Sequence, residues 1–320
     1  MVKILQCSDL HMWKDMNKLE AIKDHANKVG ADATFVLGDL IDGIELLKKT
    51  IKMGVDREQF TQLDQMFSQV KNRQSLEQML EKGNAPKENK EAYLGSYEKY
   101  QSLLKVSAGT VIEESRRVYK SMDQIFSQFN TGVYGLPGNH DPATFYEMRN
   151  IQKIDKTGSF NVEGISFLGS VNSYELIIGL PRLLFPHLSI DLTKEHIKQI
   201  AENYERIGAG KKEKIVEELL KNLPEYNRIM QNEFDYLLTH KGVEEMAMEG
   251  NRNCGAGEGI SRAINQKRNS IKAVLGGHIH NHNVWNTNGL LKIRSSNNIF
   301  YEIDINENDK KIDKLQIYQV

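Results

Sequence analysis

The sequence predicts an α/β protein built on parallel strands and interrupted by a long helical insertion. Three observations lead to this class. Residues 2–37 read as strand, helix and strand, which is the beginning of a βαβ unit. Residues 44–130 show helical periodicity and contain a single proline. The residues after Asn283 alternate between polar and apolar, as antiparallel strands with one exposed face do.

The βαβ unit starts with an apolar strand over 2–7. A helix follows, and its apolar residues recur at three- and four-residue spacing: Leu19, Ile22, Ala26 and Val29. Gly30 ends this helix, because glycine readily adopts the left-handed conformation that closes a helix. The second strand, 33–37, is mostly apolar and runs into Gly38-Asp39.

The 44–130 insertion is predicted as two to four helices packed in a small bundle, with breaks near 83–86 and 107–109. Its apolar stripes have helical spacing, and we interpret them as core positions: Phe60, Leu63, Phe67 and Val70, then Tyr93, Tyr97, Tyr100 and Leu104, then Val118, Met122, Ile125 and Phe129. The insertion leaves the chain just after Asp39 and returns just before Asn139. We therefore expect it to overhang a site at those residues as a cap or lid.

The remaining elements complete one domain, predicted to cover 1–320 around the insertion. A smaller helical segment is expected within 190–230, its apolar spacing over 193–223 ending at Pro224, and another helix near 259–269. Further strands are expected over 133–136, 160–170, 234–238, 273–275, 284–293, 300–305 and 317–320.

Composition excludes several classes of protein. Lys and Arg number 42 against 43 Asp and Glu, so the net charge of -1 argues against a strongly basic nucleic-acid binder. The 2 cysteines, Cys7 and Cys254, exclude a disulfide framework. The sequence has neither a signal-peptide core nor an apolar run of about 18 residues that could span a membrane. A cytoplasmic location without a membrane partner is the resulting expectation.

Five predicted strands are followed by residue types that bind metals. They are Asp9 and His11; Asp39 with Asp42; Asn139, His140 and Asp141; His240; and His278 with His280. In an open α/β sheet, ligand sites form beyond the carboxyl ends of the strands, so these distant segments are expected to meet. Alternate residues of an extended segment face the same side, which suits the Asp-x-His and His-x-His pairs.

The mixture of donors points to divalent ions. A pair of ions about 3.5–4 Å apart needs a shared carboxylate and enough neutral ligands to leave positive charge for a phosphate. Imidazoles together with oxygen ligands favour manganese, iron or zinc over magnesium alone.

The five blocks in this order resemble the calcineurin-like metallophosphoesterase superfamily. The resemblance covers about 1–43, 131–175 and 232–320, and leaves out the helical insertion. It implies a four-layer αββα sandwich of two mixed sheets, of the α/β class and α+β in some schemes. It also implies a metal-dependent phosphoric ester hydrolase.

The resemblance implies a role for each matching residue. Asp9, His11 and His280 would bind one metal ion, Asn139, His240 and His278 a second, and Asp39 would bridge them. Manganese is the expected metal, with iron, zinc and nickel as alternatives. A metal-bridging hydroxide would attack phosphorus.

The third block would add the groups that assist catalysis. His140 would protonate the leaving oxygen or steady the transition-state charge, and Asp141 would orient His140 through its other ring nitrogen. For Asp42, a helix cap or a hydrogen bond to the loop is the simpler reading. Arg252, beside a glycine-rich stretch, and His282 are weaker candidates for substrate contact.

A phosphate ester is the expected substrate, and a phosphodiester is preferred. Phosphoprotein phosphatases of this superfamily carry an arginine after the second and third blocks, where this chain has Gly43 and Pro142. This difference argues against a Ser/Thr protein phosphatase. The alternatives are a phosphomonoesterase, a DNA-processing nuclease and a non-catalytic binding scaffold. The charge does not indicate nucleic acid, and the oligomeric state is left open.

Overall fold

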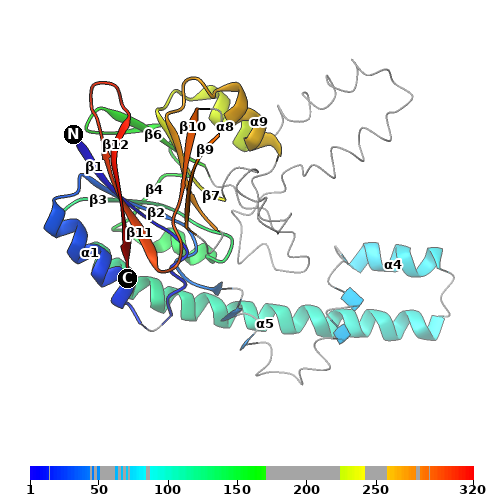
Figure 1. The fold of residues 1–320 in the computed structure, drawn as a ribbon. Helices are drawn as coiled ribbons and strands as arrows, with labels where there is room; N and C mark the ends of the chain where they lie inside the picture. Colours follow the sequence, from blue (N-terminus) through cyan, green and yellow to red (C-terminus); the bar gives the residue numbers. More distant parts are fainter. Residues whose placement is uncertain are drawn as a thin grey trace, which may run out of the picture.

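The computed structural model describes residues 1–13, 15–43, 45–46, 49–50, 62–63, 66–67, 70, 73–83, 87–170, 224–241, 258–278, 282–287 and 289–320. Figure 1 shows two sheets packed face to face, with helices on both outer sides. One sheet has the strand order β12-β11-β1-β2-β3-β4 and the other β5-β6-β7-β8-β10-β9. We call them sheet A and sheet B.

Sheet A consists of β1 (Val2–Cys7), β2 (Ala33–Leu37), β3 (Gly132–Leu136), β4 (Gln152–Lys153), β11 (Ile299–Ile305) and β12 (Ile312–Gln319). Sheet B consists of β5 (Phe160–Val162), β6 (Ile165–Ser170), β7 (Tyr236–Lys241), β8 (Ala273–Gly277), β9 (Asn283–Thr287) and β10 (Leu290–Arg294). The described helices are α1 (Asn17–Val29), α4 (Arg73–Lys82), α5 (Lys87–Phe126), the 3-10 helix η1 (Ala143–Glu147), α8 (Pro224–Gln231) and α9 (Glu258–Gln266).

Both sheets are mixed, and the central strands of each sheet run parallel to one another. In sheet A, β1 to β4 run parallel; β11 pairs antiparallel with β1, and β12 pairs antiparallel with β11. In sheet B, β6, β7, β8 and β10 run parallel, and β5 and β9 close the edges antiparallel. The carboxyl ends of the parallel strands therefore share one end of each sheet.

Three apolar clusters hold the four layers together. The inner faces of the two sheets meet through residues such as Phe35, Phe167 and Ile293. The outer face of sheet A packs on α1 and on the second half of α5. The outer face of sheet B packs on α8 and α9. The predicted four-layer αββα sandwich is confirmed, because each sheet has one buried face toward its partner and one toward helices.

The insertion differs from the predicted bundle, because α5 runs unbroken over 40 residues where a break was expected at 107–109. The buried face of the helix continues through this stretch, in Leu104, Ala108, Val111, Ser115 and Val118. A Cβ at Gly109 would meet nothing within 4 Å, so Gly109 lies on the open side. A glycine there costs roughly 1 kcal/mol relative to alanine, which continuous packing can offset.

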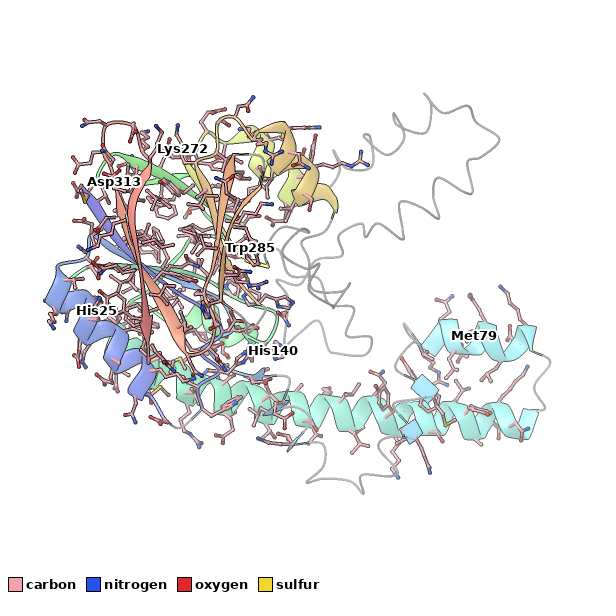
Figure 2. The ribbon with its side chains drawn as sticks, in the orientation of Figure 1. His25, Met79, His140, Lys272, Trp285 and Asp313 are labelled. Atoms are coloured by element: carbon pink, nitrogen blue, oxygen red, sulfur yellow. The ribbon has the colours of Figure 1, made fainter. Side chains whose placement is uncertain are left out.

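The long helix has two environments. Its second half belongs to the apolar cluster under sheet A. Its first half forms a separate cluster with α4, which includes Leu76, Tyr97 and Leu104. Figures 1 and 2 show α4 and this first half as an arm that extends away from the sandwich, with Met79 on the arm and His140 at the sandwich. The cap or lid role of the insertion stays a prediction.

One expected boundary cannot be compared with the structure, and another is wrong. The helix expected over 193–223, ending at Pro224, lies outside the described residues; Pro224 itself is the first residue of α8, where the missing N–H of a proline is tolerated. Strand β7 begins at Tyr236 and continues through His240 to Lys241, two residues later than expected at its start. No described helix is both long enough and apolar enough to cross a membrane.

The two clusters of α5 predict different effects of core truncation. Met122 is fully buried under sheet A, so Met122→Ala should lower the free energy of unfolding of the sandwich by about 2–5 kcal/mol. Leu76→Ala, in the arm, should leave the main urea transition followed by circular dichroism unchanged. A shift of the main transition of similar size in both variants would contradict the separation of arm and sandwich.

Candidate metal centre

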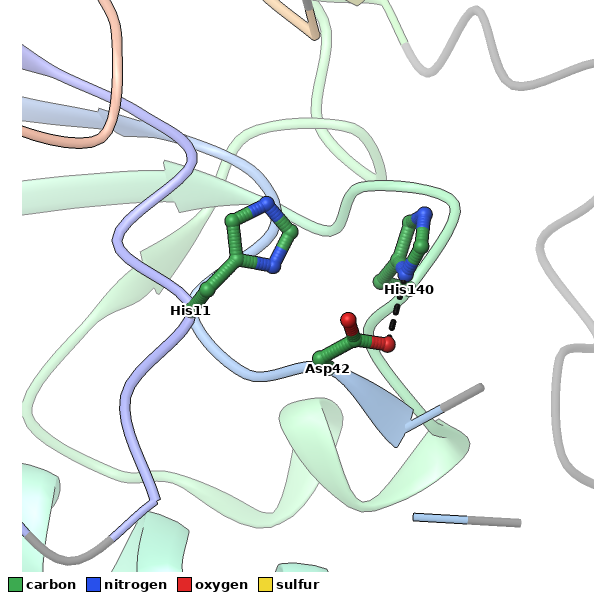
Figure 3. A group of neighbouring side chains, drawn as sticks. All are labelled: His11, Asp42 and His140. Atoms are coloured by element: carbon green, nitrogen blue, oxygen red, sulfur yellow. Dashed lines mark hydrogen bonds and ion pairs between the residues drawn. The ribbon is translucent and has the colours of Figure 1, made fainter. Parts of the chain in front are cut away.

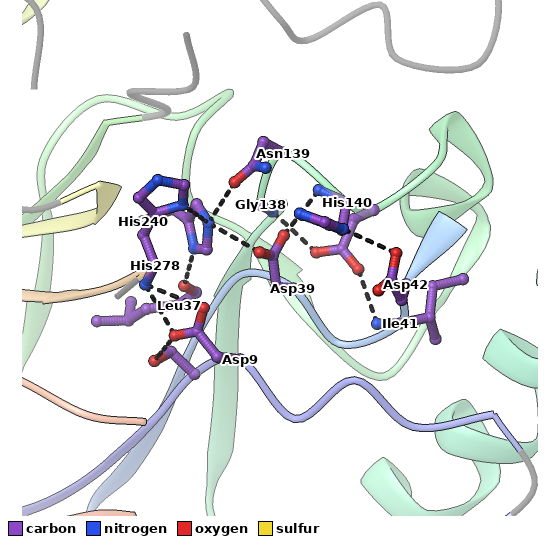
Figure 4. Close-up of polar contacts among 12 residues, drawn as sticks. Asp9, Leu37, Asp39, Ile41, Asp42, Gly138, Asn139, His140, His240 and His278 are labelled. Carbon is purple, nitrogen blue, oxygen red and sulfur yellow. Dashed lines mark hydrogen bonds and ion pairs between the residues drawn. The ribbon is translucent and has the colours of Figure 1, made fainter. Parts of the chain in front are cut away.

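The predicted ligands meet at the carboxyl ends of the parallel strands of both sheets. Sheet A contributes Asp9 and His11 after β1, Asp39 after β2 and Asn139 after β3; sheet B contributes His240 from the end of β7 and His278 after β8. Figure 4 shows Asp9, Asp39, Asn139, His240 and His278 converging from the two sheets. His280 and Arg252 lie outside the described residues. His282 is described and exposed, just before β9.

Two triads of ligand atoms share one carboxylate. Asp9, His11 and Asp39 form one group, and Asp39, His240 and His278 form the other. Within each group the candidate ligand atoms lie within 4.8 Å of one another. The Asp39 carboxylate belongs to both groups, so it could contact an ion in each of them at the same time.

The orientation of His240 makes this centre suitable for a cation. Its Nδ1–H donates to the carbonyl oxygen of Leu37 at 2.8 Å, so the neutral ring presents the lone pair of Nε2. That Nε2 lies 2.9 Å from Oδ1 of Asn139 and 3.2 Å from Oδ2 of Asp39. Three atoms that can accept converge here, and a metal ion or an extra proton would satisfy all of them.

The buried charge also fits divalent ions. Asp9, Asp39 and Asp141 are almost completely buried. In the described part of the chain, these carboxylates contact imidazoles, hydroxyl groups and backbone N–H groups, rather than Lys or Arg. Burying carboxylates is costly without a compensating positive charge, and the carboxylate, imidazole and amide donors match what a manganese, iron or zinc ion accepts.

The ligand loops are fastened to one another by the same carboxylates. Asp9 accepts the backbone N–H of His278 with both oxygens, at 3.0 and 2.8 Å. Asp39 accepts the backbone N–H of His140 at 2.8 Å. Backbone N–H groups of Asp9 and His11 donate to the carbonyl oxygens of Gly38 and Asp39. The candidate ligands are thus fixed relative to each other before any ion is bound.

The backbone at the site is strained. Four predicted ligands have positive φ angles: Asp9 (55°), His11 (47°), Asp39 (52°) and His278 (74°). Residues other than glycine take this left-handed conformation rarely, and it concentrates at functional sites. The sequence gives little sign of this strain, because the glycines that usually mark it stand one position earlier, at Gly38 and Gly277.

Two glycines allow the close approach of the ligand loops. Gly38 has φ +84°, and a Cβ there would lie 2.5 Å from Nδ1 of His240. A Cβ at Gly277 would lie 2.6 Å from Oδ2 of Asp9 and would also collide with the side chain of Ser8. Larger residues at these positions would push the ligands apart.

Burial and neighbouring charges set the protonation of the metal-free site. Burial raises the pKa of Asp9 to about 6, and the nearby Asp39 carboxylate adds to the rise. Burial disfavours the charge of His240, but the Asp39 carboxylate overrides it and raises the pKa of His240 to about 9. Burial opposes the charge of Asp39 as well, yet the imidazoles of His240, His140 and His11 hold its pKa well below the usual range. Asp39 is therefore the carboxylate that stays ionised, and its negative charge raises the pKa values of Asp9 and His240.

His140 forms a second cluster with Asp42 and His11. The Nδ1 of His140 lies 2.8 Å from Oδ1 of Asp42, and the rings of His140 and His11 meet edge to face at 5.4 Å (Figure 3). The same oxygen of Asp42 accepts the backbone N–H of Glu45 at 2.8 Å. Asp42 thus has the capping bond that the sequence suggested, and it also orients the imidazole. Burial opposes its charge, but His140 lowers the pKa of Asp42.

The expectation that Asp141 orients His140 is wrong. The Asp141 carboxylate accepts the backbone N–H groups of Gly138 and Ile41, and it is Asp42 that contacts Nδ1 of His140. An Asp directly after His140 looks like a partner in sequence. The carboxylate that contacts the ring instead comes from Asp42, in the loop after β2.

Other features of the site had no visible sequence signal. The pairing of β7 with β8 shifts between Leu238 and Lys241, so Thr239 and His240 face a single residue of β8. Such bulges redirect side chains next to active sites, and this one lies at His240. Buried polar side chains also join the two sheets below the ligands: the Gln6 amide donates to the carbonyl of Gly276 at 2.8 Å, and Ser8 and Ser295 share a hydrogen bond.

Comparison with known proteins agrees with this geometry. A family model described as calcineurin-like phosphoesterase matches residues 2–282. No curated protein matches the chain in sequence. One solved structure shares 11% identity and a TM-score of 0.50, over 99% of this chain and 98% of its own. At that identity the likeness shows the fold alone.

Two other solved structures give lower scores. A protein of Thermus thermophilus has 11% identity and a TM-score of 0.44, over 99% of this chain and 98% of its own. A dimetal phosphatase from Danio rerio has 10% identity and a TM-score of 0.42, over 99% and 98%.

Proposed function

The chain belongs to the calcineurin-like phosphoesterase family, and we propose that its strand-end cluster binds two divalent ions to hydrolyse a phosphodiester. Membership makes the chain a metal-dependent phosphoester hydrolase. The sharing of Asp39 between the two triads is the observation that carries the finer proposal. A carboxylate between two ions is what a two-metal phosphoryl-transfer site requires.

The proposed ligand sets follow the triads. Asp9 and His11, joined by His280, would hold one ion; Asn139, His240 and His278 would hold the other; Asp39 would contact both. Two divalent ions would supply Lewis-acid charge to a phosphoryl oxygen and lower the pKa of a bound water. Manganese is the proposed metal, with iron, zinc and nickel as alternatives that the same donors accept.

His140 is proposed as the general acid. Its Nδ1–H is held by Asp42, and that carboxylate stabilises a doubly protonated ring. The Nε2–H of such an imidazolium can donate to the oxygen that leaves phosphorus. Both side chains are about one-quarter exposed, so a substrate can reach the ring from solvent. Asp42 would act as a positioning residue, since it acts through His140.

The preference for a diester follows from charge. A phosphodiester carries one negative charge near neutral pH, whereas a monoester carries nearly two, because its second pKa is about 6. The positions where phosphoprotein phosphatases have arginines carry Gly43 and Pro142 here. A centre with less positive charge in those two loops suits the less charged ester.

The substrate class can be tested with paired nitrophenyl esters. We expect the manganese-loaded protein to hydrolyse bis(4-nitrophenyl) phosphate with a kcat/KM at least about tenfold higher than 4-nitrophenyl phosphate, a difference of roughly 1.4 kcal/mol. A higher value for the monoester would refute the diester preference. Shortening of single-stranded DNA in the same buffer would favour the nuclease alternative, and inactivity on all three substrates would favour a binding scaffold.

The shared carboxylate can be tested by calorimetry. Asp39→Asn should weaken the binding of both manganese ions by more than the 10–100-fold that outer-shell changes typically cost. The matched control is Asp235→Asn, because Asp235 precedes β7 at the opposite end from His240 and accepts a bond from the backbone of Ser166. Loss of only one ion in Asp39→Asn would contradict a bridging role.

The role of His140 can be tested with leaving groups of different basicity. Removing a general acid costs about 10²–10⁴-fold in rate, but a nitrophenolate departs without a proton. His140→Ala should therefore slow an alkyl phosphodiester far more than a nitrophenyl one, and Asp42→Asn should do so to a smaller extent. The control is His25→Ala, which removes a histidine of α1 that pairs with Glu302 and belongs to neither cluster of the candidate site. Equal losses on both substrates would speak against proton donation by His140.

A further inference from the structure

The Asp141 carboxylate joins the two central ligand loops. Its Oδ2 accepts the backbone N–H of Gly138 at 2.8 Å, in the loop that carries Asn139 and His140. Its Oδ1 accepts the backbone N–H of Ile41 at 3.2 Å, in the loop between Asp39 and Asp42. One fully buried side chain thus holds both loops at a fixed separation.

A third donor to this carboxylate comes from the helical insertion. The hydroxyl of Tyr119, on α5, donates to Oδ1 of Asp141 at 2.7 Å. Tyr119 is almost completely buried, and its ring meets Phe145 of η1 edge to face at 6.1 Å. The tyrosine therefore cannot turn away from Asp141 without disturbing the packing around it.

The contact belongs to a continuous interface between α5 and the segment after His140. Ser115 and Thr144 share a hydrogen bond of 2.7 Å one turn away from Tyr119. Next to Ser115 in the helix, on the exposed side, Arg116 forms an ion pair with Glu147. Of these three contacts, only the one made by Tyr119 reaches a side chain that holds the ligand loops.

We propose that Tyr119 is a positioning residue of the metal centre, which acts through Asp141 to set the spacing of the Asp39 and Asn139 loops. The proposal rests on the function proposed above. Without the hydroxyl, Oδ1 would retain only the longer bond to Ile41, and a buried carboxylate that loses a donor shifts toward new ones. A displacement at Gly138 would be felt at Asn139, its neighbour in the chain.

In this role, a residue of the helical insertion supports the metal centre through a hydrogen bond to Asp141. Tyr119 lies 20 residues before Asn139 and outside every metal-binding block. The role also means that excision of the whole insertion would remove a support of the metal centre together with the arm.

The test compares two variants that each lose one buried hydrogen bond between α5 and the same segment. Tyr119→Phe removes the bond to Asp141 and keeps the ring, and Ser115→Ala removes the bond to Thr144. Manganese binding to each full-length variant is measured by calorimetry. We expect Tyr119→Phe to raise a manganese dissociation constant about tenfold, within the range for outer-shell partners, and Ser115→Ala to change it less than about twofold.

A second measurement uses metal-free protein. Amide hydrogen exchange of peptides covering 38–43 and 136–142 should be faster in Tyr119→Phe than in Ser115→Ala, because Ile41 and Gly138 donate to the carboxylate that has lost its third donor. Equal exchange in the two variants, or equal manganese affinity, would overturn the proposal. If the wild-type protein bound no manganese, the proposed function would fail, and the exchange result would still decide whether Tyr119 fixes the loops.

Discussion

The burial of the Asp39 carboxylate is the constraint on which the rest of the site depends. This side chain is 1% exposed, belongs to both candidate triads and contacts His240 and the backbone of His140. An isolated carboxylate in such a place would take up a proton. Here the surrounding imidazoles keep its pKa low. The site is thus arranged around a negative charge that a pair of divalent ions would neutralise.

The fold provides that arrangement by bringing two sheets together at their carboxyl ends. Left-handed residues turn the chain sharply after β1, β2 and β8, and the adjacent glycines allow the loops to approach. Carboxylates then join loop to loop: Asp9 to His278, Asp39 to His140, and Asp141 to Gly138 and Ile41. The strain and the polar contacts support each other, because each strained turn is held by a hydrogen bond to the loop that follows another strand.

The sequence predicts the site best where metal-binding residue types directly follow an apolar strand pattern. The strand-end positions of Asp9, Asp39, Asn139 and His278 could be predicted, because metal-binding residue types followed apolar runs. The partner of His140 could not, since side-chain direction in a turn depends on φ angles that the sequence does not display. The unbroken α5 was missed for a similar reason: small residues at 107–109 look like a break until the buried face of the helix is seen to continue through them.

The proposed position of Asp39 between two ions can be examined in a crystal structure of the manganese-loaded protein. Anomalous diffraction at the manganese absorption edge would locate the ions independently of the protein atoms. We expect two peaks about 3.5–4 Å apart, with the Asp39 carboxylate in contact with both ions. A single ion, or a pair of ions without Asp39 between them, would contradict this expectation.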